Sequence, residues 1–270
     1  MAAAAFTPLV VPHAFVASMI AAGVLCLVLP VLFAFWARRR FALRWGWVGF
    51  GALGFVLSQA VHVPLILLAK HFWLDGRTTA LIIFASATAG LCEETARWFL
   101  LRRAVGDHSF RGGFGYGVGH GGVEAFLLAG VGGLIGVVQV LALAKLDPST
   151  LPLTPDKLEA VRQAQAHIAQ MVQGGWAVPF ASVWERIWAV TLQLGLSLCV
   201  LRAVVRRKPG WLLLAMVLHA GVDVFGVLTM QWWGVLGAET FIGLVGVLAL
   251  AFVVSEWRRW KQSEATAGPA

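Results

Sequence analysis

The sequence predicts an all-α polytopic membrane protein. Hydrophobic residues make up 59% of the 270 positions and charged residues only 13%, whereas a soluble domain carries about 25% charged residues. The apolar residues are gathered into long stretches, and about 20 such residues in a helix span the hydrocarbon layer. Short blocks of Lys and Arg separate several of the stretches. We therefore expect a multi-pass protein of the cell membrane (plasma or inner membrane).

About seven stretches are long and apolar enough to be transmembrane helices. Their approximate bounds are 11–37, 45–69, 78–101, a long stretch from 113, 178–201, 210–230 and 235–256. Pro30 is expected to kink the first stretch, and the glycines from Gly130 to Gly133 are expected to break the fourth. The sequence predicts one transmembrane domain over residues 1–257, followed by a cytoplasmic tail at 258–270.

The positive charges predict how the helices are oriented. Blocks of Lys and Arg follow the first, third, fifth and seventh stretches, and the other loops carry little charge. Because cytoplasmic loops are rich in Lys and Arg, we expect the N-terminus outside and the C-terminus in the cytoplasm. The net charge of +8 then reflects orientation in the lipid bilayer, and no nucleic-acid partner is expected.

The polar segment between the fourth and fifth stretches is predicted to hold an amphipathic helix on the outer surface. Thr154 suits the N-cap and Pro155 the first helical position. An apolar stripe at helical spacing follows, made of Leu158, Val161, Ile168 and Val172. A partly ordered loop is the alternative interpretation.

Ionisable residues near the end of the third stretch indicate a site within the membrane. Glu93, Glu94 and Arg97 lie in an otherwise apolar run, where each charge costs at least about 2.5 kcal/mol. Counting about 1.5 Å per residue from the cytoplasmic ends of three stretches places Glu93, His120 and His219 roughly 13–16 Å deep. Because these residues come from three different stretches, their common depth predicts one shared site.

Each of these three residues has a polar companion one helical turn further on. The pairs are Glu93 with Arg97, His120 with Glu124, and His219 with Asp223. A histidine with a carboxylate on the same helical face can be an oriented general base or part of a metal site. Many glycines surround His120, and they leave room for another helix or for a substrate segment. Both interpretations of the glycines stay open.

Three motifs in matching order resemble those of the CAAX-processing and bacteriocin-immunity (CPBP) clan of type II CAAX prenyl endopeptidase-like proteases. Members of that clan share a Glu-Glu motif with a basic residue, an aromatic-xxx-His motif and a His-xxx-Asn/Asp motif. The matching segments here are 93–97, 116–120 and 219–223. The string GVGHGGVEA at 117–125 most resembles the YhfC branch of intramembrane proteases. The resemblance covers about residues 80–225, the expected catalytic core.

The resemblance implies an intramembrane endopeptidase that hydrolyses a peptide bond of a membrane-associated protein or peptide. Glu93 with His120 would activate a water molecule, and His219 with Asp223 would stabilise the oxyanion. The implied supporting residues are Glu94, Arg97, Tyr116 and Glu124.

Two departures from the CAAX endopeptidases keep alternatives open. Arg97 is one position closer to the glutamates, so it can pair with Glu93 or Glu94; we expect Glu93 to be the base and Glu94 to pair with Arg97. Asp223 replaces an Asn, and a carboxylate cannot donate to an oxyanion unless it is protonated.

Zinc is the alternative to a metal-free glutamic mechanism, because zinc binds His and Asp/Glu ligands. No cofactor is favoured, but the expected zinc ligands would be Glu93, His120, His219 and Asp223. A non-catalytic immunity or scaffold protein, or a transporter, on the same fold is also open.

Other polar residues in the apolar stretches are expected to have structural roles. Glu185 and Arg186 are expected to brace the helical bundle, and His62 to lie at an interface or in solvent. Gln59 and Gln193 are expected to donate hydrogen bonds between helices.

Overall fold

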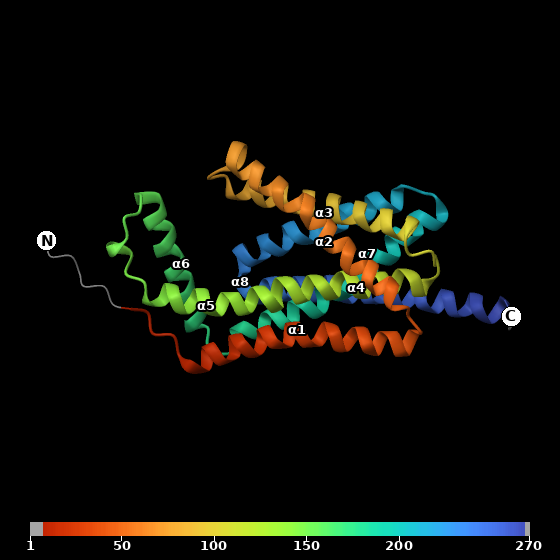
Figure 1. Cartoon of the computed structure of the whole chain (residues 1–270), viewed down its shortest axis with the longest axis horizontal. Helices are drawn as coiled ribbons and strands as arrows, with labels where there is room; N and C mark the ends of the chain where they lie inside the picture. Colours follow the sequence, from red (N-terminus) through yellow and green to blue (C-terminus); the bar gives the residue numbers. More distant parts are fainter. Residues whose placement is uncertain (1–7, 268–270) are drawn as a thin grey trace. The chain divides into compact units, whose positions relative to one another are not determined.

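The computed structural model describes residues 8–267, which are almost entirely helical and contain no strand (Figure 1). The main helices are α1 (His13–Phe41), α2 (Trp45–Ala69), α3 (Thr78–Arg103), α4 (Phe110–Glu124), α5 (Gly132–Lys145), α6 (Pro155–Gln173), α7 (Ala181–Arg206) and α8 (Gly210–Ala267). Two π-helical turns, Lys70–Leu74 and Ala125–Val131, and two 3-10 turns, Pro148–Thr150 and Val178–Phe180, complete the helical structure. The predicted all-α fold is confirmed.

Five helical stretches among the described residues are long and apolar enough to cross a membrane. They are His13–Phe41, Trp45–Leu74, Phe110–Lys145, Val178–Arg206 and Gly210–Thr266. The protein is therefore a multi-pass membrane protein. Helix α3 is not among the five, because Glu93, Glu94 and Arg97 make it less apolar than the others.

Helix α8 consists of two arms that meet at Gly234. This residue has a φ of 68° and a ψ of −164°, a conformation that is readily adopted only by glycine. Figure 1 shows the two arms running in opposite directions. The arms correspond to the expected sixth and seventh stretches, and the second arm continues as a helix through residues 258–267 of the expected tail.

The expected break in the fourth stretch is a widened turn that leaves the chain helical. Helix α4 passes through the π-helical turn Ala125–Val131 into α5. The turn begins directly after Glu124, earlier than the glycines on which the expectation rested. Such π-helical turns are frequent at functional sites.

The described residues divide between two compact units, one within residues 1–28 and 126–183 and the other within residues 29–125 and 184–270. In the first unit, α6 begins at Pro155 as predicted, and its apolar stripe is the less exposed face of the helix, with Ile168 buried. The amide of Gln165 donates to the carbonyl oxygens of Leu143 and Leu146 at 2.8 and 2.7 Å. These bonds fasten α6 to the C-terminal end of α5.

In the second unit, glycines let α2 and α4 pack with their backbones in contact. A Cβ atom at Gly51 would overlap the backbone carbonyl of Tyr116, and a Cβ atom at Gly119 would overlap that of Val48. Only a residue without a side chain fits at such a crossing. As a result, α4 is buried along nearly its whole length, and His120 has no exposed surface.

Candidate active site

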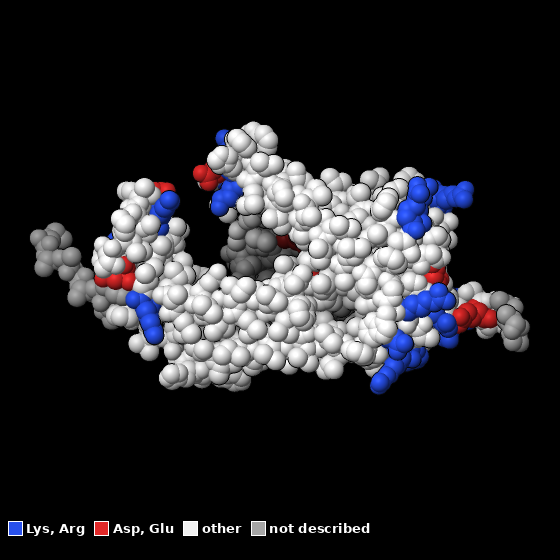
Figure 2. Space-filling view, viewed as in Figure 1, with Lys and Arg blue, Asp and Glu red and all other residues white. Residues whose placement is uncertain are grey.

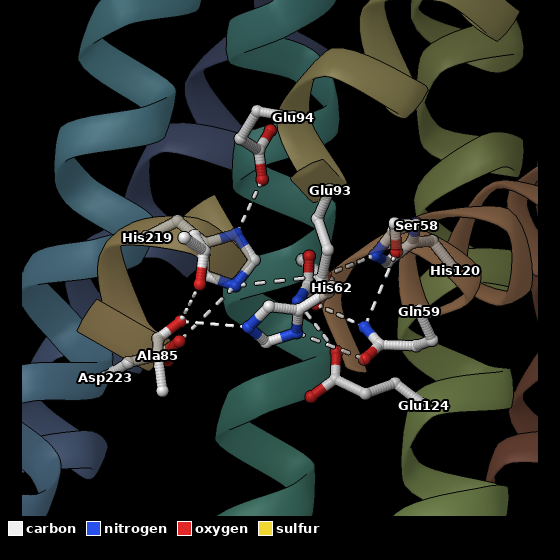
Figure 3. A network of polar contacts seen from close by, with 12 residues as sticks. Ser58, Gln59, His62, Ala85, Glu93, Glu94, His120, Glu124, His219 and Asp223 are labelled. Atoms are coloured by element: carbon white, nitrogen blue, oxygen red, sulfur yellow. Dashed lines mark hydrogen bonds and ion pairs between the residues drawn. The ribbon is translucent and has the colours of Figure 1, made fainter. Parts of the chain in front are cut away.

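Glu93 of α3 lies at the centre of a polar network in the second unit (Figure 3). Its Oε2 atom is 2.9 Å from Nε2 of His120 on α4 and 3.8 Å from Nε2 of His219 on the first arm of α8. The side chain of Glu93 is 7% exposed and those of the two histidines are no more exposed. The three residues that the sequence placed at one depth thus meet around one carboxylate oxygen.

The other carboxylate oxygen of Glu93 is held from α2. Gln59 Nε2 donates to Glu93 Oε1 at 2.9 Å, so Gln59 does donate between helices. The Oε1 atom of Gln59 lies 3.3 Å from Nδ1 of His62, and Nε2 of His62 lies 3.0 Å from the carbonyl oxygen of Ala85. The expectation that His62 lies at an interface or in solvent was wrong, because both of its ring nitrogens have partners inside the protein.

Glu94 joins a buried cation to a buried imidazole. Its Oε2 atom is 3.3 Å from Nη1 of Arg97, and neither side chain has exposed surface. Its Oε1 atom is 2.7 Å from Nδ1 of His219. A hydrogen bond to one ring nitrogen fixes the orientation of a histidine. Glu94 therefore turns the other nitrogen of His219 toward Glu93.

Asp223 lies at the margin of the network. Its Oδ2 atom is 3.8 Å from Nε2 of His219, and its side chain is 40% exposed. That separation is too long for a hydrogen bond. The i,i+4 spacing does bring Asp223 near His219, but Glu94 on α3 is the carboxylate that holds the ring.

Glu124, one turn after His120, is held by α7. Its Oε1 atom accepts from Nη1 of Arg186 at 3.0 Å, and its Oε2 atom accepts from Nε2 of Gln193 at 2.7 Å. The Oε1 atom of Gln193 in turn accepts from Arg97. Arg186 thus braces the bundle through a residue of the site. Gln193 therefore connects Glu124 to Arg97 and, through Arg97, to Glu94. The sequence did not indicate this connection.

Tyr116 supports the site by packing. Its ring is stacked against that of His120, with the centroids 5.9 Å apart and the planes at 29°. The hydroxyl packs against Gly54 of α2 and has no hydrogen-bond partner in the part of the chain that the structure describes. Tyr116 therefore restricts the orientation of the His120 ring from the turn before it.

Three of these residues could hold a metal ion. Glu93, His120 and Glu124 each offer a ligand atom, and these atoms lie within 4.8 Å of one another. Two carboxylates and an imidazole are ligands that zinc accepts, and Nδ1 of His120 is buried without a hydrogen-bond partner among residues 8–267. The donors therefore fit a zinc site. His219 and Asp223, which the sequence placed in the zinc set, lie outside this group, and Glu124 joins it instead.

Comparisons with known proteins agree with the resemblance seen in the sequence. A protein of Bacillus subtilis (strain 168) described as "Uncharacterized membrane protein YhfC" is 28% identical over 248 residues, which are 87% of this chain and 94% of the relative. No solved structure gives a significant match. The sequence model of one family, described as YhfC intramembrane metalloprotease, matches residues 25–247. Since this match spans most of the chain, the protein belongs to the YhfC intramembrane metalloprotease family.

Proposed function

We propose that this protein is an intramembrane endopeptidase that hydrolyses a peptide bond of a membrane-associated protein. The observation that carries the proposal is the meeting of Glu93, His120 and His219, from three helices, around one buried carboxylate oxygen. The family description, an intramembrane metalloprotease, supports the same class of reaction.

Glu93 and His120 are suited to activate the attacking water. A general base must lie within hydrogen-bond reach of the proton that it takes, and Oε2 of Glu93 is directed at the space shared with the two histidines (Figure 3). Glu93 accepts a proton from water as the oxygen attacks the carbonyl carbon of the peptide. The same proton then passes to the leaving amine, and Glu93 returns to its carboxylate form.

His219 is suited to stabilise the oxyanion. Its Nδ1–H donates to Glu94 at 2.7 Å, and its Nε2 faces Glu93. With both ring nitrogens protonated, Nε2–H can donate to the oxygen of the carbonyl group under attack. A donor held in place inside a site that excludes bulk water stabilises developing charge more strongly than a donor in water.

The residues that would hold a metal ion are Glu93, His120 and Glu124. When bound, zinc would polarise the scissile carbonyl group and make a bound water more acidic. Arg186 and Gln193 would keep Glu124 directed at the site. Because Glu93 would then be a metal ligand, the metal-dependent form is an alternative to the mechanism in which Glu93 is the free general base.

In the proposed topology the protein crosses the membrane seven times. The crossing segments are α1, α2, α3, α4 with α5, α7 and the two arms of α8, and α6 lies on the outer surface. Within the second unit, Figure 2 shows Lys and Arg gathered at the end where α8 terminates. This distribution supports a cytoplasmic C-terminus and an outer N-terminus. Cysteine labelling from either side at Glu264 and at Glu159, each replaced by Cys, tests this topology.

The proposed activity is tested with the purified protein in liposomes that contain membrane-tethered peptides. We expect Glu93→Gln, His120→Ala and His219→Ala to reduce cleavage by at least about 10²-fold, the usual effect of losing a general base or an oxyanion donor. Glu159→Gln on exposed α6 is the control and should cleave like wild type. Wild-type cleavage by all three site variants would exclude the proposal. Loss of cleavage on chelation, with recovery on adding zinc, would identify the metal-dependent form.

A further inference from the structure

A chain of hydrogen bonds leaves α3, crosses to α2 and returns to α3. Nε2 of His62 lies 3.0 Å from the carbonyl oxygen of Ala85, and Nδ1 of His62 lies 3.3 Å from Oε1 of Gln59 (Figure 3). Nε2 of Gln59 donates to Oε1 of Glu93 at 2.9 Å. His62 is 8% exposed. Polar side chains inside a membrane helix are costly and usually serve a function, and the reaction described above uses neither Gln59 nor His62.

The chemistry of the groups fixes the direction of these bonds. An ionised carboxylate only accepts hydrogen bonds, so Gln59 directs its NH2 group at Glu93 and its carbonyl oxygen at His62. The Ala85 carbonyl also only accepts. One tautomer of His62 therefore donates to Gln59, the other donates to Ala85, and the doubly protonated ring donates to both. In each case the amide of Gln59 keeps its NH2 group toward Glu93.

We propose that Gln59, held in place by His62, is the positioning residue for Glu93. By binding Oε1, Gln59 leaves Oε2 as the oxygen that faces His120 and His219. A glutamate side chain has several rotatable bonds, and without this contact its carboxylate turns more freely. The effect on catalysis rests on the proposed protease function, whereas the contact between Gln59 and Glu93 does not.

The backbone of α2 is rigid enough to support this role. Gly51 and Gly54 hold α2 directly against α4, which carries His120. Gln59 and His62 follow on the next turns of the same helix. The packing between α2 and α4 therefore fixes Gln59 relative to both Glu93 and His120.

A double-mutant cycle tests the positioning role in the full-length protein. We expect Gln59→Leu to lower kcat on a membrane-tethered peptide by on the order of 10²-fold, because small misplacements of a reacting group have effects of that size. KM should stay unchanged, because Gln59 acts on Glu93 and not on the peptide. His62→Leu should lower kcat less. Adding it to Gln59→Leu should cause no further loss, because His62 acts only through Gln59.

A conservative variant and a control variant make the double-mutant cycle more specific. His62→Asn retains an amide that can donate to Gln59, so it should recover part of the kcat lost in His62→Leu. Thr229→Val removes a buried hydroxyl group of α8 that donates to the Phe225 and Gly226 carbonyls of its own helix, and it should leave kcat unchanged. Fully additive losses for Gln59→Leu and His62→Leu, or a KM effect as large as the kcat effect, would overturn the positioning role.

A second readout separates this inference from the proposed function. The midpoints of thermal unfolding of Gln59→Leu, Glu93→Leu and the double variant should be non-additive, because each single variant removes the hydrogen bond between the two side chains. Additive midpoints would exclude the contact even if the protein is a protease. Absence of cleavage by the wild-type protein, with non-additive midpoints, would instead reject the protease and keep the contact.

Discussion

His219 Nδ1 lies 2.7 Å from Oε1 of Glu94, although a carboxylate on its own helix, Asp223, is only one turn away. The ring is therefore held across the bundle, from α3 to α8. The same Glu94 carboxylate pairs with Arg97, so a single buried side chain fixes a cation and an imidazole.

Loss of Glu94 should be highly destabilising. Glu94→Ala leaves Arg97 buried without its carboxylate, and breaking a buried ion pair in this way costs about 3–5 kcal/mol. Unfolding of the protein in detergent, followed by circular dichroism against temperature or denaturant, measures the loss. Glu159→Gln is the exposed control and should change stability by less than about 0.5 kcal/mol. A Glu94→Ala protein as stable as the control would contradict this account of the ion pair.

Asp223→Asn should be much milder. Asp223 is 40% exposed and makes no close bond to His219, and exposed ion pairs contribute about 0–1 kcal/mol. An Asn at this position can also donate to an oxyanion, which an ionised Asp cannot. We expect near-wild-type stability and retained cleavage of membrane-tethered peptides. Loss of cleavage in a stable Asp223→Asn protein would show that the negative charge itself is required.

The close crossing of α2 and α4 predicts opposite effects for two glycines of α2. A Cβ atom at Gly51 meets the backbone of α4, whereas a Cβ atom at Gly49 meets no other helix of residues 8–267 within 4 Å. Gly51→Ala should destabilise the protein by about 3 kcal/mol, as severe overpacking does. Gly49→Ala should be neutral or stabilising by up to about 1 kcal/mol, the difference in helix propensity. Thermal unfolding of the two variants, side by side, checks the crossing.

Metal content distinguishes the zinc set seen in the structure from the one expected from the sequence. If zinc binds at Glu93, His120 and Glu124, then His120→Ala and Glu124→Gln should lose it, and Asp223→Asn should keep it. Arg186→Ala should weaken zinc binding by about 10–100-fold, because partners of ligands have effects of that size. Elemental analysis of protein purified without chelator measures the zinc content of each variant. Zinc retained by Glu124→Gln but lost by Asp223→Asn would favour the expected set.

The helices and the depth of the site could be predicted because both follow from residue order. The apolar stretch predicted at 45–69 is α2. Counting residues from the expected cytoplasmic ends placed Glu93, His120 and His219 at a common depth, and these three residues do lie together. Helix α1 ends later than expected, at Phe41, because hydropathy marks where a helix leaves the lipid and not where its hydrogen bonding stops. Spacing along one helix also indicated the ion pair of Glu94 with Arg97.

The contacts between helices could not be predicted in the same way. The spacing of four residues predicted Asp223 as the partner of His219. In the structure α8 packs against α3 so that His219 lies closer to Glu94 than to Asp223. His62 is buried with a hydrogen bond to the backbone carbonyl of Ala85 on α3. The order of side chains in the sequence does not predict such a contact with a backbone group. Gln193 was expected to donate between helices, but only the packing of α7 shows that it joins Arg97 to Glu124.

The burial of Arg97 has a consequence for how the protein is made. Its amide partner, Gln193, is 96 residues further along the chain. At synthesis rates of about 5–20 residues per second, roughly 5–20 s separate the two on the ribosome. During this interval the guanidinium group of Arg97 has its carboxylate partner Glu94 on the same helix but lacks the amide of Gln193, for which the lipid offers no substitute. Nascent α3 should therefore remain near the translocon until α7 emerges, and chains truncated before Gln193 should be substrates for membrane quality control.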